Sequence, residues 1–295
     1  MIQNKIKGVG VALITPFDNY KVDYPALGRM VDHVIEGGVD YIVALGSTAE
    51  TATLNIEERQ QVYNYIVERT AGRVPIVVGM GSNNTQEIVE QLQSFDMHDA
   101  VAILSVVPYY NKPSQEGIYR HYIAVAEASP VPVILYNVPG RTGVNMTAET
   151  TLRLARATDK IIAVKEASGS LEQMQCIIDG KPEGFVVLSG DDGLTVELIK
   201  RGGDGVISVA ANAFVQRFCG CIHNAMAGDI AVAEEDMEQM LKPIDLLFKE
   251  GNPTSVKVMT NLMGLTTTEV RLPLVEGTKS LTEEMKETIE KYNLR

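Results

Sequence analysis

The sequence predicts an α/β fold, a (β/α)8 barrel with a C-terminal helical extension, and three observations support this prediction. The chain has 295 residues, of which 45% are hydrophobic, so it can bury a large core. Short apolar runs alternate with stretches of helical periodicity, and eight such cycles follow one another. The runs are apolar along their whole length, which is typical of parallel strands covered on both faces. Eight units favour a closed barrel over an open sheet.

The predicted elements follow in order along the chain. Strands are expected at residues 9–15, 41–45, 76–79, 101–106, 133–137, 161–165, 186–189 and 205–209. Helices are expected between them, at 24–36, 56–70, 84–97, 115–128, 147–157, 170–179, 192–201 and 213–227. Glycine pairs at 37–38 and 202–203 end helices ahead of strands, and Thr147 has the residue type of a helix start. The catalytic barrel is therefore expected to span residues 1–228.

The chain continues after the eighth unit without a further strand pattern. Residues 230–250, 253–263 and 282–292 have helical periodicity. They predict a helical appendage over residues 229–295, packed against the barrel. The sequence leaves open whether this appendage forms subunit contacts or only covers the side of the barrel.

Charge and composition exclude several classes of function. Lys+Arg 26 against Asp+Glu 38 give a net charge of -12, which repels nucleic acids and anionic membranes. No apolar run reaches the roughly 18 residues of a membrane span, and the first residues lack a signal-peptide pattern. A cytoplasmic protein is therefore expected. The cysteines lack the spacing of a disulfide framework or a zinc site and are interpreted as small core residues: Cys176, Cys219 and Cys221.

A lysine and a tyrosine at predicted strand ends give the strongest signal for chemistry. Lys165 ends the apolar run 161–165, and Tyr136 lies near the end of the preceding run, 133–137. If the two runs are neighbouring parallel strands, the amine and the phenol lie side by side. Burial disfavours the ammonium form of a lysine, and a neutral amine can attack a carbonyl group to form a Schiff base.

Other polar residues fall in the loops after predicted strands, where barrel enzymes carry their active sites. Ser47 and Thr48 follow the second strand and can hold a carboxylate, although helix capping is an equal alternative. Tyr109 and Tyr110 follow the fourth strand, where surface packing or a subunit interface is the alternative to proton transfer. Arg141 follows the fifth strand and can bind a carboxylate with two hydrogen bonds, although a lone loop arginine is usually just solvated.

A metal site is not expected. Asp191 and Asp192 follow the seventh strand, but no histidine falls at a predicted strand end to complete a ligand set. The two carboxylates would also repel a phosphate group, which argues against a phosphate-binding barrel.

Eight short motifs form a highly specific combination. They are Gly46-Ser-Thr-Ala-Glu50, Pro108-Tyr-Tyr-Asn111, Tyr136-Asn-Val-Pro139, Arg141-Thr-Gly143, Lys165-Glu-Ala167, Leu188-Ser-Gly-Asp-Asp192, Gly205-Val-Ile-Ser-Val209 and Asn252-Pro253. In order and spacing they resemble the dihydrodipicolinate synthase family, within the N-acetylneuraminate lyase superfamily. The resemblance runs nearly from end to end of the chain.

This resemblance implies a (β/α)8 TIM barrel that assembles as a homotetramer, a dimer of dimers. It implies the condensation of pyruvate with L-aspartate 4-semialdehyde to 4-hydroxy-tetrahydrodipicolinate, the first committed step toward diaminopimelate and lysine. No metal or organic cofactor is implied. Lys165 would form the Schiff base, and Tyr136 would transfer protons through Ser47 and through Tyr110, which the neighbouring subunit would supply.

The resemblance also implies roles in substrate binding. Thr48 would hold the carboxylate of pyruvate, and Arg141 would bind the carboxylate of the semialdehyde. The backbone of Gly190 and Ile207 would line the site. Four residues match the lysine-effector pocket of the family: Ser82, Asn83, Glu87 and Tyr109.

Two departures from the family pattern bear on these implications. Ser47 and Ala49 stand where threonine and glycine are common; serine keeps the hydroxyl group but lacks the methyl group that restricts χ1, which predicts a slower but working relay. Ile56 and Arg59 stand where a lysine-sensitive form has histidines, so inhibition by lysine stays open.

Related and unrelated functions remain as alternatives. An N-acetylneuraminate lyase or a 2-keto-3-deoxy sugar acid aldolase would share the barrel, Lys165 and Tyr136. Arg141 favours a short acidic aldehyde over a sugar acid, because a sugar is better bound by neutral polar groups. A non-catalytic barrel would be expected to lack the lysine or the tyrosine, and both are present.

Overall fold

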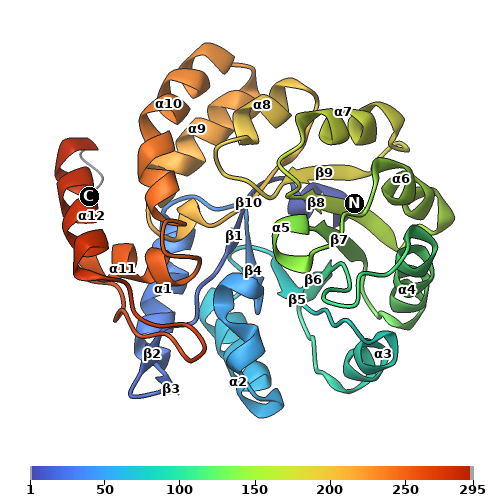
Figure 1. The fold of residues 1–295 in the computed structure, drawn as a ribbon, viewed down its shortest axis with the longest axis horizontal. Coiled ribbons are helices and arrows are strands. Elements are labelled where there is room, and N and C mark those ends of the chain that lie inside the picture. The colour runs from blue at the N-terminus through green and yellow to red at the C-terminus, as the bar shows by residue number, and fades with distance from the viewer. Residues whose placement is uncertain (1, 293–295) are drawn as a thin grey trace.

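Eight parallel strands close into a barrel in this computed structural model, which describes residues 2–292 (Figure 1). The barrel strands are β1 (Gly8–Ala12), β4 (Tyr41–Ala44), β5 (Ile76–Gly79), β6 (Ala100–Val106), β7 (Val133–Asn137), β8 (Ile161–Glu166), β9 (Val186–Ser189) and β10 (Gly205–Ser208). Each pairs with its neighbour along the chain, and β10 pairs with β1 to close the ring. The predicted barrel is confirmed.

Helices alternate with the strands and surround them (Figure 1). They are α1 (Tyr24–Glu36), α2 (Ile56–Thr70), α3 (Thr85–Ser94), α4 (Gln115–Ala128), α6 (Ala148–Ala157), α7 (Leu171–Gly180), α8 (Thr195–Lys200) and α9 (Val215–Ala227), with a short α5 (Pro139–Thr142) after β7. Six helices begin at a polar side chain that accepts a hydrogen bond from the first turn: Asp23, Asn55, Asn84, Ser114, Thr147 and Ser170.

Apolar side chains pack in two layers, because successive residues of a strand point to opposite faces. Leu135 and Val164 face outward and pack with the helices. Ile134, Tyr136 and Ile207 face inward and fill the barrel. The inward face of β7 and β8 therefore ends in the polar groups of the candidate site.

Three helices follow the barrel: α10 (Ile230–Leu246), α11 (Thr254–Leu262) and α12 (Lys279–Tyr292). Helix α10 packs on α9 and α8, and α12 packs on α10 and α11. The predicted boundary after residue 228 falls in the turn between α9 and α10, where Gly228 adopts a φ of 96°. The helices lie on one side of the barrel (Figure 1).

Several predicted boundaries were wrong, and side-chain contacts explain two of them. The first strand ends at Ala12 instead of residue 15, because Asn212 binds the Ala12 carbonyl and the Ile14 N–H group. Helix α8 begins at Thr195 instead of residue 192, because Asp191 accepts hydrogen bonds from a turn before it.

Five other predicted elements end early: the second strand at Ala44, the last strand at Ser208, α3 at Ser94, α10 at Leu246 and α11 at Leu262. The antiparallel hairpin of β2 (Phe17–Asp18) and β3 (Lys21–Val22) was not predicted, because each of its strands has only two residues.

Candidate active site

Lys165 and Tyr136 lie side by side at the ends of adjacent strands. The two residues are paired in the register of β7 and β8, and the Lys165 Nζ atom lies 4.4 Å from the centre of the Tyr136 ring. Both side chains are buried, with relative exposures of 5% and 8%. Among residues 2–292, no carboxylate oxygen lies within 4.0 Å of the Lys165 amine. The predicted juxtaposition of an amine and a phenol is therefore present.

Gly190, at the end of β9, leaves room for the Lys165 side chain. A Cβ atom at residue 190 would lie 2.4 Å from the Cβ atom of Ala167 and 3.1 Å from the Cε atom of Lys165. Both distances are too short for ordinary packing. The absence of a side chain at Gly190 is thus part of how Lys165 fits.

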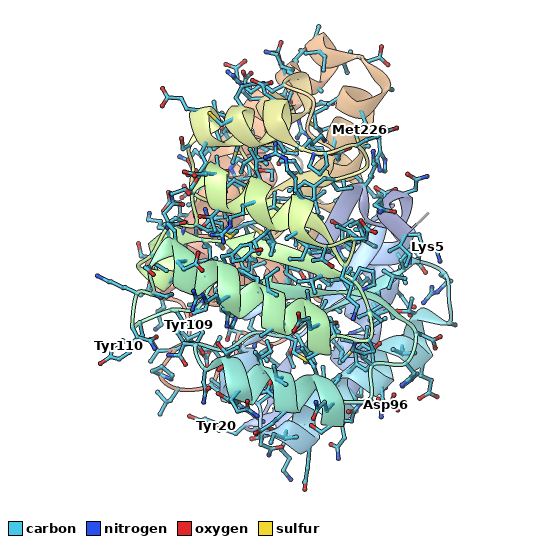
Figure 2. The ribbon with its side chains drawn as sticks, turned by 90° about the vertical axis from the view of Figure 1, so that its right-hand side faces the viewer. Lys5, Tyr20, Asp96, Tyr109, Tyr110 and Met226 are labelled. Atoms are coloured by element: carbon cyan, nitrogen blue, oxygen red, sulfur yellow. The ribbon has the colours of Figure 1, made fainter. Side chains whose placement is uncertain are left out.

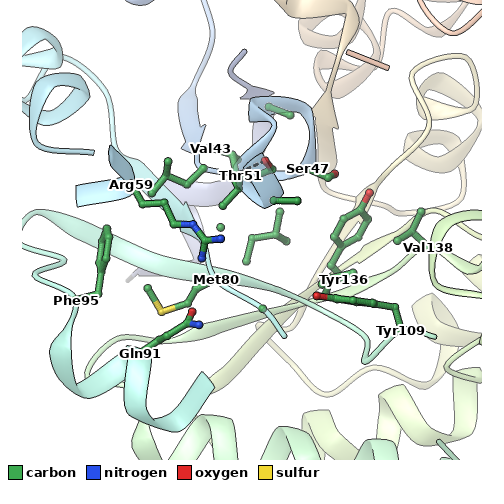
Figure 3. Close-up of a pocket in the computed structure, with 18 of the residues that line it drawn as sticks. Val43, Ser47, Thr51, Arg59, Met80, Gln91, Phe95, Tyr109, Tyr136 and Val138 are labelled. Carbon is green, nitrogen blue, oxygen red and sulfur yellow. Dashed lines mark hydrogen bonds between the residues drawn. The ribbon is translucent and has the colours of Figure 1, made fainter. Parts of the chain in front are cut away.

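A cavity of about 430 Å³ opens above this pair. Its inner end is lined by Lys165, Tyr136, Ser47, Arg141 and Tyr109. Ser47 and Tyr136 lie on one side of the cavity in the close-up, and Tyr109 reaches toward them from the loop after β6 (Figure 3). The volume lies within the range of roughly 300–1,000 Å³ that is typical of small-molecule sites.

The turn after β4 presents two hydroxyl groups. Ser47 and Thr48 belong to a short 3₁₀ helix, Ser47–Ala49. The Thr48 Oγ1 atom accepts a hydrogen bond of 2.9 Å from Asn252 Nδ2, and neither hydroxyl caps α2, whose N-cap is Asn55. The structure thus does not use these hydroxyl groups for helix capping, which was the equal alternative.

Arg141 is held by the single helical turn α5. Pro139 favours the start of this turn and Gly143, with a φ of 74°, ends it. The Arg141 Nη2 atom donates a hydrogen bond of 3.2 Å to the backbone carbonyl of Asn252, and the exposed side chain lines the cavity. The guanidinium group keeps donors available for a carboxylate.

Tyr110 does not line the cavity of its own chain. Its side chain is 86% exposed, and its backbone has a φ of 73° in the left-handed region, which is uncommon for a bulky residue. Tyr110 lies at the edge of the molecule, on the loop that also carries Tyr109 (Figure 2). Thr48, Gly190 and Ile207 are also absent from the cavity lining.

The cavity has a second, outer end, of which sequence reasoning named only Ile56 and Arg59. It is lined by Ile56, Arg59, Met80, Gln91 and Phe95. Arg59 and Gln91 lie across the cavity from Tyr136 (Figure 3). These residues come from α2, from the segment after β5 and from α3 with its C-cap, so only the folded chain brings them together.

The four predicted effector residues are divided by the structure. Tyr109 lines the cavity, whereas Ser82, Asn83 and Glu87 do not. The Ser82 Oγ atom donates a hydrogen bond of 2.7 Å to Glu87 Oε2 and accepts one from the Asn84 N–H group. Ser82 and Glu87 therefore brace the start of α3.

The aspartates after β9 bind backbone groups. Asp192 Oδ2 accepts hydrogen bonds of 3.1 and 2.9 Å from the N–H groups of Val209 and Ala210. Burial raises the pKa of Asp192 to about 6. Asp192 thus ties β9 to the loop after β10, and Asp191 binds the turn before α8.

None of the helices described between residues 2 and 292 has the length and apolar character of a membrane span.

Comparison with known proteins places these features in context. A model of the Dihydrodipicolinate synthetase family matches residues 5–292. A 4-hydroxy-tetrahydrodipicolinate synthase of Phocaeicola vulgatus is 52% identical over 296 residues, which cover 100% of each chain. The match thus includes the barrel and the helical extension.

Two solved structures have the same fold. A chloride-inhibited dihydrodipicolinate synthase from Acinetobacter baumannii, complexed with pyruvate, has a TM-score of 0.95 at 38% identity and covers 98% of this chain and 100% of its own. A DHDPS from Cyanidioschyzon merolae with lysine bound has a TM-score of 0.93 at 36% identity, with coverages of 98% and 99%.

Proposed function

We propose that this chain, which belongs to the dihydrodipicolinate synthetase family, condenses pyruvate with L-aspartate 4-semialdehyde to give 4-hydroxy-tetrahydrodipicolinate. The observation that carries the proposal is the buried amine of Lys165 beside the phenol of Tyr136 at the base of a small cavity. The pyruvate complex of the Acinetobacter baumannii relative supports pyruvate as the first substrate.

The chemistry begins at Lys165. Its neutral amine attacks the ketone carbon of pyruvate, and loss of water gives an iminium ion. The iminium draws electrons from the methyl carbon, which loses a proton and becomes an enamine. The enamine carbon attacks the aldehyde carbon of the semialdehyde and forms the new carbon–carbon bond. The amino group of the semialdehyde then attacks the iminium carbon, which closes the ring, breaks the bond to Lys165 and frees its amine for the next cycle.

Tyr136 moves the protons of these steps. Its phenol lies against the amine, so it can donate a proton as water leaves the carbinolamine and a proton to the alkoxide formed in the condensation. Ser47 lies at the same end of the cavity and links Tyr136 to Tyr110 of a neighbouring subunit in a homotetramer.

Two carboxylate contacts orient the substrates. Thr48 holds the pyruvate carboxylate through its hydroxyl and backbone N–H groups, and Arg141 binds the carboxylate of the semialdehyde. The backbone of Gly190 and Ile207 borders the site. Arg141 favours this acidic aldehyde over the sugar acids of related aldolases, because its guanidinium group matches a carboxylate in shape and charge.

Lysine, the end product of this route, is the effector that we propose for a pocket formed by Ser82, Asn83, Glu87 and Tyr109. The lysine complex of the Cyanidioschyzon merolae relative supports this assignment. Arg59 opposes it, because its guanidinium group lines the cavity and repels a second cation. We therefore expect weak inhibition by lysine.

The function is tested with purified protein, both substrates and a downstream reductase that reports the product. We expect turnover by the unchanged protein and none above background for Lys165→Ala. Lys160→Ala is the matched control, because Lys160 lies at the opposite end of the same strand, where it binds backbone carbonyls. Its activity should stay near that of the unchanged protein.

Borohydride separates the possible failures. Reduction in the presence of pyruvate should add one reduced pyruvate to Lys165, as read by mass spectrometry of the peptide. An adduct without turnover would indicate a different aldehyde substrate, such as a sugar acid. The absence of both the adduct and turnover would contradict the proposed function and would favour a non-catalytic barrel.

A further inference from the structure

Among residues 2–292, the helical extension makes four hydrogen bonds to the loop after β4, three of them from side chains. This loop carries Ser47 and Thr48 and leads into α2. The three side-chain contacts run from Asn252 Nδ2 to Thr48 Oγ1 (2.9 Å), from Lys257 Nζ to Glu50 Oε1 (2.5 Å) and from Arg271 Nη1 to the Thr53 carbonyl (3.0 Å). Each joins residues roughly two hundred positions apart in the chain. The extension therefore reaches the catalytic end of the barrel.

The central contact is a buried ion pair. The side chains of Lys257 and Glu50 have relative exposures of 0% and 1%. Lys257 Nζ also donates a hydrogen bond of 2.8 Å to the Glu269 carbonyl and lies 4.2 Å from the centre of the Phe17 ring. Glu50 Oε2 accepts a hydrogen bond of 2.9 Å from the Arg271 N–H group. Both charged groups are thus fully surrounded by protein.

A buried ion pair by itself adds little to the stability of a fold. Removing two charges from water costs several kcal/mol for each ion, and apolar residues of similar volume often stabilise a fold equally well or better. Burial lowers the pKa of Lys257 to about 8, although Glu50 opposes this shift. The ion pair with Glu50 favours the charged form of the lysine. A role beyond stability is therefore worth seeking for the pair.

Glu50 occupies the residue that shapes the loop. Its φ of 54° and ψ of 33° place it in the left-handed region, between the 3₁₀ turns Ser47–Ala49 and Thr51–Thr53. This conformation is strained for a residue other than glycine and persists where surrounding contacts impose it. The Glu50 N–H group donates to the Ser47 carbonyl at 3.1 Å, so a shift of Glu50 is passed directly to Ser47 and Thr48.

We propose that Lys257 is a positioning residue, which holds Glu50 and thereby fixes the Ser47–Thr48 turn in the geometry that binds the first substrate. The helical extension is then part of the catalytic apparatus in addition to covering the barrel. The inference rests on the proposed function, because it assigns the turn to the carboxylate of pyruvate. It differs from that function in naming residues that never touch the substrate.

The first test is Lys257→Met in the full-length protein at pH 7. Methionine fills the space but leaves Glu50 buried without its counter-ion. The loop should then relax to bring the carboxylate to water. We expect KM for pyruvate to rise at least about 10-fold, with KM for the semialdehyde changing less than about 3-fold. The pyruvate concentration that half-saturates borohydride trapping should rise by the same factor as KM.

A second variant separates positioning from folding. Glu50→Gln with Lys257→Met removes the unpaired charge, so the melting temperature should recover relative to Lys257→Met alone. The proposal predicts that KM for pyruvate stays raised in this double variant, because the neutral pair no longer holds the loop. Lys249→Met is the matched control, because Lys249 pairs with Glu284 inside the extension. Its KM for pyruvate should not change.

The outcomes are distinct. Recovery of both melting temperature and KM in the double variant would overturn the proposal and leave the pair a purely structural contact. Equal trapping of pyruvate by the unchanged protein and by the variants would also overturn it, while leaving the proposed function intact. Absence of trapping in the unchanged protein would instead remove the proposed function and this inference with it.

Discussion

The amine of Lys165 is adjacent in sequence to a carboxylate that does not reach it. Glu166 is fully buried and accepts hydrogen bonds from Asn137, Ser168 and Gln173. Successive residues of a strand point to opposite faces, so Glu166 lies outside the barrel wall while Lys165 points into the cavity. An ion pair would hold the lysine in its charged form. The alternation of the strand therefore keeps a nucleophilic amine available.

Ser47→Ala tests the proposed relay at the level of one hydroxyl group. A positioned proton-transfer group contributes about 10²- to 10⁴-fold to a rate, so we expect kcat to fall by at least about 10²-fold. KM for pyruvate should change little if Thr48 binds the carboxylate. Steady-state kinetics of both substrates measure the two effects separately.

Ser47→Thr is the matched control for this variant. Threonine keeps the hydroxyl and adds a methyl group that restricts χ1, so its kcat should equal or exceed that of the unchanged protein. Near-normal kcat for Ser47→Ala would remove Ser47 from the relay.

The pair of Lys165 and Tyr136 could be predicted from sequence, but the residues that contact the neighbouring loop after β4 could not. Lys165 and Tyr136 each end an apolar run, and the rule that parallel strand ends meet at one edge was enough to bring them together. Asn252 and Lys257 belong to α11 or the turn before it, and no local pattern links them to Thr48 and Glu50. Their contacts depend on how the extension packs, which propensity and periodicity do not describe.

At the scale of elements, the barrel was predictable because its local signals agree. Apolar runs and helical periodicity mark the same eight units, and the type of each was correct. One error lies at an end where a distant side chain decides the boundary, since Asn212 ends β1. The roles assigned to individual site residues remain predictions, because no bound substrate tests them.

Helix α4 contains a buried histidine that contacts α3 and makes stability depend on pH. His121 shares a hydrogen bond of 2.9 Å with Thr85, and its Nε2 atom is buried without a partner among the described residues. Burial lowers the pKa of His121 from 6.5 to about 4. Folding therefore favours the neutral form of the His121 imidazole.

The sign of the effect follows from proton binding. Between pH 6.5 and 4 the unfolded chain binds a proton at this histidine that the folded protein does not bind, so acid favours unfolding. The contribution of the neutral His121 to the free energy of unfolding is complete above pH 6.5 and is lost as the pH falls toward 4. The free energy of unfolding should decline by up to about 1.4 kcal/mol per pH unit from this group alone.

The comparison of two proteins isolates His121 from the other titrating groups. His121→Phe removes this titration. The free energy of unfolding of the unchanged protein should therefore fall relative to that of the variant as the pH falls from 6.5 to 4. Urea denaturation at several pH values gives both curves. Parallel curves would show that His121 does not titrate in this range.

At the scale of the whole molecule, the exposed tyrosine loop indicates an incomplete site. Tyr110 is held in a left-handed backbone conformation with its side chain in solvent, and Tyr109 beside it reaches the cavity. A strained, exposed aromatic residue is costly unless another surface receives it. The family resemblance predicts a homotetramer, and we expect each Tyr110 to enter the cavity of a neighbouring subunit in it. Light scattering after size-exclusion chromatography measures this state.

Mixing two inactive variants tests whether Tyr110 acts across the subunit contact. Tyr110→Phe should lower kcat by about 10²-fold or more, and Lys165→Ala should abolish turnover. After subunit exchange, a mixed pair contains one complete site, with Lys165 from one chain and Tyr110 from the other. An equal mixture should therefore regain about a quarter of the unchanged activity, because half of the pairs are mixed and each restores one of two sites. A mixture of Tyr136→Phe and Lys165→Ala is the control and should regain nothing, since both residues line one cavity of one chain. Equal failure of both mixtures, with exchange confirmed by mass spectrometry, would show that Tyr110 serves its own chain or none.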